Sequence, residues 1–423
     1  MNTDARKIVE NLYHDRGLFC DDEPPKPLES RFKSRSIHVN TIFGKVHLKR
    51  SYYYHHASKT GRCPLDETLG LEGNYTPALT RIICRVASMT PSFEQGSGDL
   101  SAIAGITVNS RQFGRLSKVV APGLKEALET ITVPEKALEK EIPILYVQCD
   151  GTGTPMRKDE LKGRKGKQAD GSSKTREAKL GCVFTQTLTD IDGKPIRDSN
   201  STSYVGTYDR CRDIATLLHQ EAQRRGLGHA KEIVYLGDGA AWIWNNCRLT
   251  FPNAIQILDF YHANEYVMEI ATQIHPEDKE QAQDLYHKWK KSMKASSPEK
   301  LIKEAREHLD QHPEWNESRR EIIESKISYL ESHAKRTNYG EYRAKGYFIG
   351  SGVIEAGCKT VVGGRLKQSG MFWSKSGAEN ILGMRCLFLG QDFDRVWKKR
   401  SELKAQERQR ARRWIADEQG NAA

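Results

Sequence analysis

Two aspartates of this sequence follow apolar runs and are themselves followed by glycine. Asp150 ends the run IPILYVQCD and Asp238 ends KEIVYLGD, and Gly151 and Gly239 come directly after them. Side chains at the carboxyl ends of strands in one α/β sheet point into a shared crevice. Two carboxylates placed together repel, so a cation between them is the best way to stabilise the pair. The sequence therefore predicts a metal site at this edge of a sheet.

A third acid completes the candidate site. Glu355 lies in GSGVIEAGCK, where Ser351 is a candidate helix cap that would place Glu355 near the first turn. Mg²⁺ prefers oxygen ligands, typically protein carboxylates together with phosphate oxygens. A pair of such ions clamps the attacking and leaving oxygens of a phosphoryl displacement. We therefore expect Asp150, Asp238 and Glu355 to bind Mg²⁺ as two ions, with Mn²⁺ as a substitute. For each acid alone the alternative is structural, because aspartates at strand ends also form turns.

Basic residues near these acids indicate a polyanionic partner. The formal net charge of the chain is +11, which favours nucleic acid, although it also serves solubility. The segment 157–179 is rich in glycine and basic residues, and we expect an arm over the site. The residues expected to contact DNA phosphates are Arg164, Lys165 and Lys167 in this arm, and Lys359, Arg365 and Lys367 after Glu355.

Two neighbouring aromatic residues have two interpretations. Phe372 and Trp373, in SGMFWS, would stack on an unpaired base of bound DNA, since every base offers a π-face. They would equally serve as core aromatics. We retain Trp373 among the candidate DNA-binding residues.

A second DNA-binding signal lies upstream, between residues 93 and 120. The pattern predicts a helix, a turn at Gly105 and a second helix capped by Asn109 or Ser110. Basic residues Arg111, Arg115 and Lys118 share one side of the second helix, as in a helix-turn-helix that reads a major groove. The alternative is a helical hairpin with a solvated basic face. The residues expected to be buried are Leu100, Ile103 and Ala104 in the first helix, Ile106 and Val108 at the corner, and Phe113, Leu116 and Val119 in the second.

The surrounding elements predict how these residues are positioned. Residues 36–54 alternate apolar and polar around a glycine, which is typical of a β-hairpin. Three strands at 142–150, 178–188 and 201–208 precede a helix at 213–225 and strands at 231–239 and 254–260. This succession predicts a mixed α/β sheet. Residues 260–345 have the composition of a helical insertion, and a helix follows near Ser351.

Cysteine usage and hydropathy limit the cellular setting. The nine cysteines are scattered and include no C-x-x-C pair, which argues against a disulfide framework or a zinc ribbon and fits a reducing cytosol. No apolar run reaches the roughly 18 residues that a membrane span needs. We therefore expect a cytoplasmic protein with no membrane partner.

From Thr41 to Trp397 the chain resembles bacterial insertion-sequence transposases of the DDE superfamily, and most closely the ISKra group. The resemblance implies a ribonuclease-H-like core in which Asp150, Asp238 and Glu355 bind the metal. It also draws attention to Asp259 and His262 in DFYH, where His262 would position a phosphate or belong to a helix cap. The strings that carry the resemblance are CDGTGTPM, GRKGKQADGSSKTREAKLGCVFTQT, YLGDGAAWIWN, LDFYHANEY and YFIGSGVIEAGCKTVVGGRLKQSGMFW.

The expected function follows from this resemblance. It is metal-dependent cleavage of double-stranded DNA at transposon terminal inverted repeats, with strand transfer into target DNA by a homodimer or larger assembly. The rival functions are an actin-like or sugar-kinase-type ATP phosphotransferase, which DGTGT resembles, and a domesticated, catalytically silent DNA-binding protein. The expected organisation is an N-terminal segment with the hairpin (1–75), the helix-turn-helix region (76–122), a linker (123–141), the first part of the core (142–262), the helical insertion (263–345), the last part of the core (346–398) and a basic tail (399–423).

Overall fold

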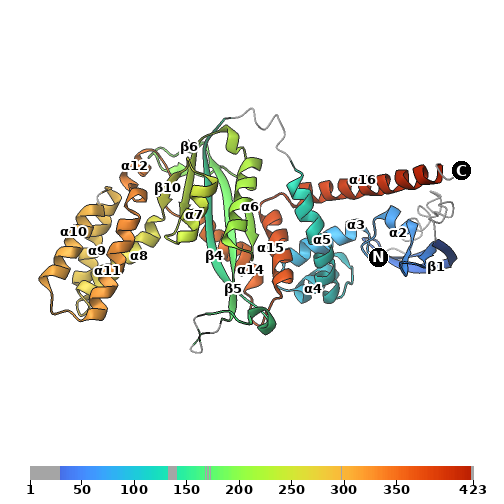
Figure 1. Ribbon diagram of the computed structural model, residues 1–423, viewed down its shortest axis with the longest axis horizontal. Coiled ribbons are helices and arrows are strands. Elements are labelled where there is room, and N and C mark those ends of the chain that lie inside the picture. The colour runs from blue at the N-terminus through green and yellow to red at the C-terminus, as the bar shows by residue number, and fades with distance from the viewer. Residues whose placement is uncertain are drawn as a thin grey trace. The chain divides into compact units, whose positions relative to one another are not determined.

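The computed structural model describes residues 29–131, 141–166, 168, 171, 173–296 and 298–420, and these form two compact units (Figure 1). Unit 1 contains the described residues up to Ile131, together with Ser374–Phe388 and the described residues from Asp392 onward. Unit 2 contains the described residues between Thr132 and Trp373, together with Leu389–Gln391. The last segment of the chain therefore belongs largely with the first, whereas the sequence assigned residues up to 398 to the core.

Unit 1 begins with a three-stranded antiparallel sheet. Strand β1 (Glu29–Thr41) pairs with β2 (Gly44–His55), which pairs with β3 (Thr60–Arg62). The expected hairpin is confirmed. Gly44 has φ of 110° at the tight turn, a conformation that glycine adopts at little cost. The sheet packs onto helix α2 (Pro64–Leu69) through a small apolar core of Val39, Val46, Leu48 and Leu65.

The helices of unit 1 follow the expected pattern with three exceptions. Helix α3 (Pro77–Met89) precedes α4 (Phe93–Ala104), which ends at Gly105 with φ of 65°, and α5 (Ser110–Glu129) begins with the Asn109 side chain as its cap. Ile106 and Val108 are buried at the corner, as expected. However, Ile103 is 87% exposed and Val119 is 51% exposed, and Ala104 is exposed as well. Position 120 rather than 119 lies on the buried face of α5, because α5 continues to Glu129 and its apolar stripe is set by Phe113, Leu116, Val120 and Leu124.

The C-terminal helices α15 (Lys375–Leu389) and α16 (Phe393–Gly420) complete unit 1. Helix α16 contacts α5, so residues 123–129, which we expected in a linker, form a packed part of a helix. The buried carboxylate of Glu72 pairs with Arg400 at 2.6 Å and with Lys404. Because Arg400 is 5% exposed, this ion pair is an internal contact that holds the first part of α16 in place. The residues expected to be a basic tail are thus helical up to Gly420.

Unit 2 is built on a mixed five-stranded sheet, which confirms the expected α/β class. Strands β4 and β5 are antiparallel, as are β5 and β8, whereas β4 is parallel to β9 and β9 is parallel to β10. Helices α6 (Cys211–Arg224) and α7 (Ala241–Thr250) connect the parallel strands. The order across the sheet is β10 (Ile255–Leu258), β9 (Ala230–Gly237), β4 (Ile142–Pro155), β5 (Thr175–Gln186) and β8 (Ser203–Thr207).

Helices cover both faces of this sheet. A methyl group on Gly181 of β5 would meet Leu218 of α6, whereas its neighbour Leu180 contacts Gly357 of α13 (Gly352–Gly357). Successive side chains of a strand point to opposite faces, so α6 and α13 lie on opposite sides. Helix α13 continues through a π-helical turn (Cys358–Gly363) into α14 (Gly364–Leu366). This layered arrangement buries strands β4 and β5 on both faces, which explains their near-continuous apolar sequence.

The expected helical insertion is confirmed in the described residues. It consists of α8 (Phe260–Ile274), α9 (Lys279–Lys294), α10 (Pro298–Gln311), α11 (Glu317–Ser332) and α12 (Tyr339–Ala344). Figure 1 shows α9, α10 and α11 packed side by side at one end of unit 2. Trp289 is fully buried and donates from its indole nitrogen to Glu304 at 2.8 Å. Throughout the described part of the chain, no helix combines the length and apolar character needed to cross a membrane.

Candidate functional site

The register of the sheet brings Asp150 and Asp238 to the same level. Strands β4 and β9 pair in parallel up to Gln148 and Leu236, and the same register carried two residues further sets Asp150 beside Asp238. Strand β9 ends at Gly237, so Asp238 follows a strand end as expected. Asp150 does not, because β4 continues to Pro155 with β5 as its antiparallel partner. The glycines at 151 and 153 therefore lie within a strand rather than in a turn.

Asp150 occupies a half-buried position with several polar neighbours. Its carboxylate accepts a hydrogen bond from the Gly151 N–H at 2.6 Å and one from the Cys358 thiol at 3.5 Å. Burial raises the pKa of Asp150, the Gly151 N–H opposes that effect, and the charges of Asp238 and Glu355 add to the rise. The carboxyl groups of Asp238 and Glu355 are therefore each close enough to affect Asp150.

Glu355 reaches Asp150 because α13 is anchored to the middle of β4. The buried side chain of Gln148 accepts a hydrogen bond from the Ile354 N–H at 3.0 Å. Gln148 and Asp150 are two residues apart on a strand and so share a face. Glu355 lies in the first turn of α13, as expected, and its side chain is exposed. Ser351 is not a side-chain cap, however, because its hydroxyl donates to Glu355 Oε1 at 2.7 Å instead.

A fourth acid, Asp259, joins the elements that carry the site. It follows β10, is 1% exposed, and accepts hydrogen bonds from the backbone N–H groups of His262 and Ser351. The backbone of Phe260 also donates to Ile349 at 2.9 Å. Asp259 thus caps α8 and holds the residue that precedes α13. It is a positioning residue for Glu355 rather than a member of the acid group.

The ligand atoms that the three acids can offer are all carboxylate oxygens, which a hard divalent cation prefers. Each is paired with a protein donor: Asp150 with Gly151 and Cys358, Asp238 with the Ala240 N–H at 2.8 Å, and Glu355 with Ser351. In keeping with this, the part of the chain that the structure describes contains no group of three His, Cys, Asp or Glu residues already arranged to hold a metal ion. Binding one cation through all three acids requires these side chains to turn from their present donors.

His262 lies beside the site rather than within the acid group. Its ring Nδ1 is 3.3 Å from Glu265 in the next turn of α8. Its ring contacts Tyr266 edge-on at 5.3 Å and lies 6.4 Å from the ring of Tyr329. The helix cap is Asp259, which accepts from the His262 backbone. The catalytic role of His262 stays a prediction.

The basic residues after Glu355 divide into exposed and buried ones. Lys359 and Lys367 are exposed, and the Lys367 ammonium donates to Thr152 on the continuation of β4. Arg365, in contrast, is 1% exposed. Its guanidinium lies 5.0 Å from the centre of the Trp373 ring, and it contacts the Met371 sulfur at 3.3 Å. Arg365 was expected to contact DNA, but its side chain packs inside the protein and lacks the exposure that a phosphate contact needs.

The two aromatic residues that follow also differ in how deeply they are buried. Trp373 is half-buried, donates from its indole nitrogen to Leu366 at 3.2 Å, and bridges by its backbone to Met156 at the end of β4. Its neighbour Phe372 is 64% exposed. Of the two, Phe372 has the free ring face that base stacking needs, and Trp373 packs under Arg365.

The remaining candidate DNA-binding residues are exposed where the structure describes them. Arg164 and Lys165 are exposed in the segment after β4, and Lys167 lies outside the described residues. In unit 1, Arg111, Arg115 and Lys118 are exposed on one side of α5, as expected. The Arg115 guanidinium donates to Gln112 at 2.7 Å, which holds it along the helix.

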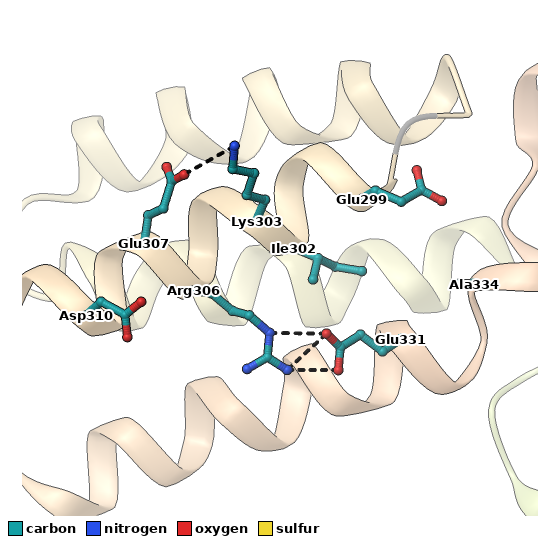
Figure 2. Close-up of a pocket in the computed structure, with 8 residues that line it drawn as sticks. All are labelled: Glu299, Ile302, Lys303, Arg306, Glu307, Asp310, Glu331 and Ala334. Atoms are coloured by element: carbon teal, nitrogen blue, oxygen red, sulfur yellow. Dashed lines mark hydrogen bonds and ion pairs between the residues drawn. The ribbon is translucent and has the colours of Figure 1, made fainter.

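A pocket lies away from these acids, on the helical insertion. Figure 2 shows it between α10 and α11, with Arg306 donating to Glu331 and Lys303 facing Glu307. Its lining residues are Glu299, Ile302, Lys303, Arg306, Glu307, Asp310, Glu331 and Ala334. The two cations drawn there are both paired, whereas Glu299 and Asp310 are drawn without a partner, so the pocket offers no free cation to bind an anionic ligand.

The sequence missed residues that build the site without lying in it. Gln148 gave a usable signal, because its spacing of two from Asp150 on a strand puts both on one face. Cys358 gave a similar one, being one turn after Glu355 on a helix. Tyr329, which covers the Asp238 loop, gave none, because its contact joins segments far apart in the chain.

Comparison with known proteins places the whole arrangement in a family. A curated relative from Streptococcus gallolyticus, "UPF0236 protein in vanSb 3'region", is 27% identical over 403 residues, covering 90% of this chain and 81% of the relative. The family described as "Uncharacterised protein family (UPF0236)" matches residues 30–401, a range that contains all three acids, the helical insertion and both groups of basic residues. On this match over most of its length, the chain belongs to the UPF0236 family.

Proposed function

We propose that this protein is a DDE transposase that cleaves DNA at the ends of an insertion sequence and joins those ends to target DNA. One observation carries the proposal. The register of β4 and β9 sets Asp238 beside Asp150, and α13, which is hydrogen-bonded to β4, brings Glu355 to the same place, so that the charges of both acids add to the raised pKa of Asp150. A protein gains nothing in stability from gathering like charges. Such a group is useful when it binds cations.

The order of the core elements supports a ribonuclease-H-like assignment. Three consecutive strands pair antiparallel, and two helical crossovers then add parallel strands on the other side of β4. The acids lie on the central strand β4 and directly after its parallel neighbour β9. This is the edge at which α/β sheets bind ligands. The long helical insertion before Glu355 agrees with the same assignment.

In the proposed mechanism, Asp150, Asp238 and Glu355 would hold Mg²⁺ ions at the site where the DNA is cleaved. The ions would supply neutralising charge for the oxygens of an in-line displacement. Lys359 and Lys367, which are exposed, would bind the neighbouring phosphates and fix the strand over the acids. Asp259 and Gln148 would keep α13 in register, so that Glu355 meets the same phosphate.

The chemistry exchanges phosphodiester bonds and consumes no nucleotide. Water attacks the phosphorus at the transposon end, a P–O bond breaks, and the terminal 3′-oxygen leaves as a hydroxyl. That hydroxyl then attacks a phosphodiester of the target, forming one P–O bond as another breaks. Joining two ends needs at least two active sites, so a homodimer on DNA is part of the proposal.

Recognition of the terminal repeats is assigned to α4 and α5. We propose that they form a helix-turn-helix, with α5 as the recognition helix. The cap at Asn109, the tight turn at Gly105 and the exposed basic side of α5 support this. A protein with this function would act on the DNA of the nucleoid, and the formal net charge of +11 agrees with such a polyanionic partner.

The test uses duplexes that cover the DNA on either side of the gene. Wild-type protein is expected to nick one of them in the presence of Mg²⁺ or Mn²⁺ and to leave a free 3′-hydroxyl. Asp150→Asn, Asp238→Asn and Glu355→Gln should each abolish nicking while retaining DNA binding. The matched control is Asp278→Asn, an exposed cap of α9, which should nick normally.

Three outcomes would contradict the proposal. DNA binding without metal-dependent nicking by wild-type protein would favour a silent DNA-binding protein. Thermal stabilisation by ATP, with no DNA binding, would favour the phosphotransferase. Nicking that survives Asp150→Asn would remove the central acid from the mechanism.

A further inference from the structure

The helical insertion reaches the candidate active site through one side chain. Tyr329 of α11 lies over Gly239, the residue directly after Asp238. A methyl group on Gly239 would stand 2.1 Å from both the hydroxyl oxygen and the Cε2 of Tyr329. That separation is far inside van der Waals contact, so the tyrosine ring and the Gly239 backbone are already in close contact.

The need for glycine at this position comes from Tyr329 and not from the backbone. Gly239 is absent from the residues with positive φ in the described chain, so an L-residue is free to adopt its conformation. At Gly237, two residues earlier, an added methyl group would meet Ile243 instead. Tyr329 therefore excludes a side chain at position 239.

The Tyr329 ring is itself held firmly. It stacks on Tyr266 of α8 with ring centres 4.0 Å apart and planes 15° apart, and it lies 4.7 Å from the ring of His333. The ammonium nitrogen of Lys326, one turn before Tyr329 on α11, lies 4.4 Å from the centre of the Tyr266 ring. Burial, assisted by the neighbouring charges of Asp238 and Asp259, raises the pKa of Tyr329, so the phenol is neutral.

The far side of the Asp238 loop is closed by the same aromatic group. His333, which is 7% exposed, lies 6.0 Å from Trp244 of α7, and the Arg336 guanidinium lies 4.4 Å from the Trp244 ring. Helix α7 begins three residues after Asp238. The loop is thus confined between its own helix and residues of the insertion.

We propose that Tyr329 is a positioning residue for Asp238, through which the helical insertion holds this carboxylate in place to bind a divalent cation. The inference rests on the proposed function for the meaning of Asp238, but the contact itself is independent of it. It gives the insertion a role in assembling the catalytic centre.

The experiment compares four variants: Tyr329→Ala, Tyr329→Phe, Gly239→Ala and the double variant Gly239→Ala/Tyr329→Ala. The matched control is Tyr286→Ala, because Tyr286 is a similarly half-buried tyrosine of the insertion with Lys290 beside its ring. Two quantities are measured on the full chain. One is hydrogen exchange of the peptide spanning residues 234–244, and the other is Mn²⁺ affinity by calorimetry.

Tyr329→Ala should speed exchange at residues 238–241 and weaken Mn²⁺ binding about tenfold or more, the range seen when groups that orient metal ligands are removed. Tyr329→Phe keeps the ring and should stay close to wild type. Gly239→Ala should weaken Mn²⁺ binding by a similar factor, because the new methyl group clashes with Tyr329. The double variant should bind no more weakly than Tyr329→Ala, since the clash is gone and the two effects are not additive.

The outcomes separate this inference from the proposed function. Unchanged exchange at residues 238–241 in Tyr329→Ala, or the same change in Tyr286→Ala, would overturn the positioning role. A double variant that shows the sum of both defects would also overturn it. Wild-type protein that binds no Mn²⁺ would contradict the proposed function instead, and the exchange data would then decide the positioning role alone.

Discussion

The carboxylate of Asp259 accepts a hydrogen bond from the backbone N–H of Ser351, 92 residues further along the chain. The other oxygen accepts from the His262 N–H at 2.5 Å. One buried charge therefore satisfies the start of α8 and the residue that precedes α13. Without it, both N–H groups would lose their acceptor, and α13, which also bonds to Gln148, would lose one of its two anchors.

Replacing Asp259 is expected to damage stability and the acid group together. Asp259→Ala should lower the free energy of unfolding by about 2–4 kcal/mol, because two hydrogen bonds to a buried charge are lost. Asp259→Asn keeps one acceptor oxygen and should lie between Ala and wild type. Urea denaturation at neutral pH measures the loss. Mn²⁺ affinity, measured on the folded variants, should fall as Glu355 is displaced.

Asp278→Ala serves as the control for this prediction. Asp278 caps α9 in the same way, accepting from Glu280 and Gln281, but it is exposed and far along the insertion. Its loss should cost about 1 kcal/mol and leave Mn²⁺ affinity unchanged. Equal losses for the two aspartates would show that Asp259 is an ordinary cap.

Arg365 and Lys367 are expected to fail in different ways, although they lie two residues apart. Arg365→Ala removes a buried side chain that packs on Trp373 and should lower the free energy of unfolding by about 2 kcal/mol or more. Lys367→Ala should change that free energy by no more than about 0.5 kcal/mol. It should instead weaken binding of duplex DNA and lower the salt dependence of binding by about one unit of slope. A reversed pattern in urea denaturation and fluorescence anisotropy would refute this division.

The basic side of α5 is expected to carry sequence-dependent DNA binding. If α5 is the recognition helix, its N-terminal residues face the bases, so Arg111→Ala and Arg115→Ala should each cost about 1–3 kcal/mol in binding to the terminal repeat. Lys125→Ala is the control, since Lys125 is exposed on the same helix but nearer its C-terminal end. Anisotropy titrations with repeat and scrambled duplexes measure both effects. Equal losses on the two duplexes would indicate phosphate contacts only.

Much of the fold was readable because it depends on local patterns. The hairpin, the caps at Gly105 and Asn109 and the order of strands and helices in unit 2 each follow from apolar periodicity and turn chemistry. The expected burial of Ile103 was wrong, because an apolar residue on a helix is buried only where another element covers it. Nothing in the described structure covers the end of α4 at this position, and the side chain is 87% exposed.

The acids of the site could be predicted from the sequence, but the residues that hold them in place could not. Asp150, Asp238 and Glu355 stand out because each follows a local signal. The end assigned to β4 at Asp150 was wrong, because the glycines that suggested a turn extend the strand beside β5. The burial of Arg365 and the contacts of Asp259 and Tyr329 were beyond reach, because they depend on pairings between distant segments that no local pattern encodes.

The stability of the aromatic group beside Asp238 is expected to depend on pH through His333. Burial, with the nearby Arg336 charge second, lowers the pKa of His333 to about 4, whereas an unfolded histidine has a pKa of about 6.5. Below about pH 6.5 the unfolded chain therefore binds a proton that the folded chain resists, so stability falls as pH falls towards 4 and is constant above that window. By about pH 5 the loss attributable to His333 should reach about 2 kcal/mol. Urea denaturation of wild type and His333→Gln across this range isolates the contribution, because all other titrating groups are shared. If the two proteins lose stability in parallel, His333 is protonated in the folded state and does not seal the Asp238 loop as a neutral ring.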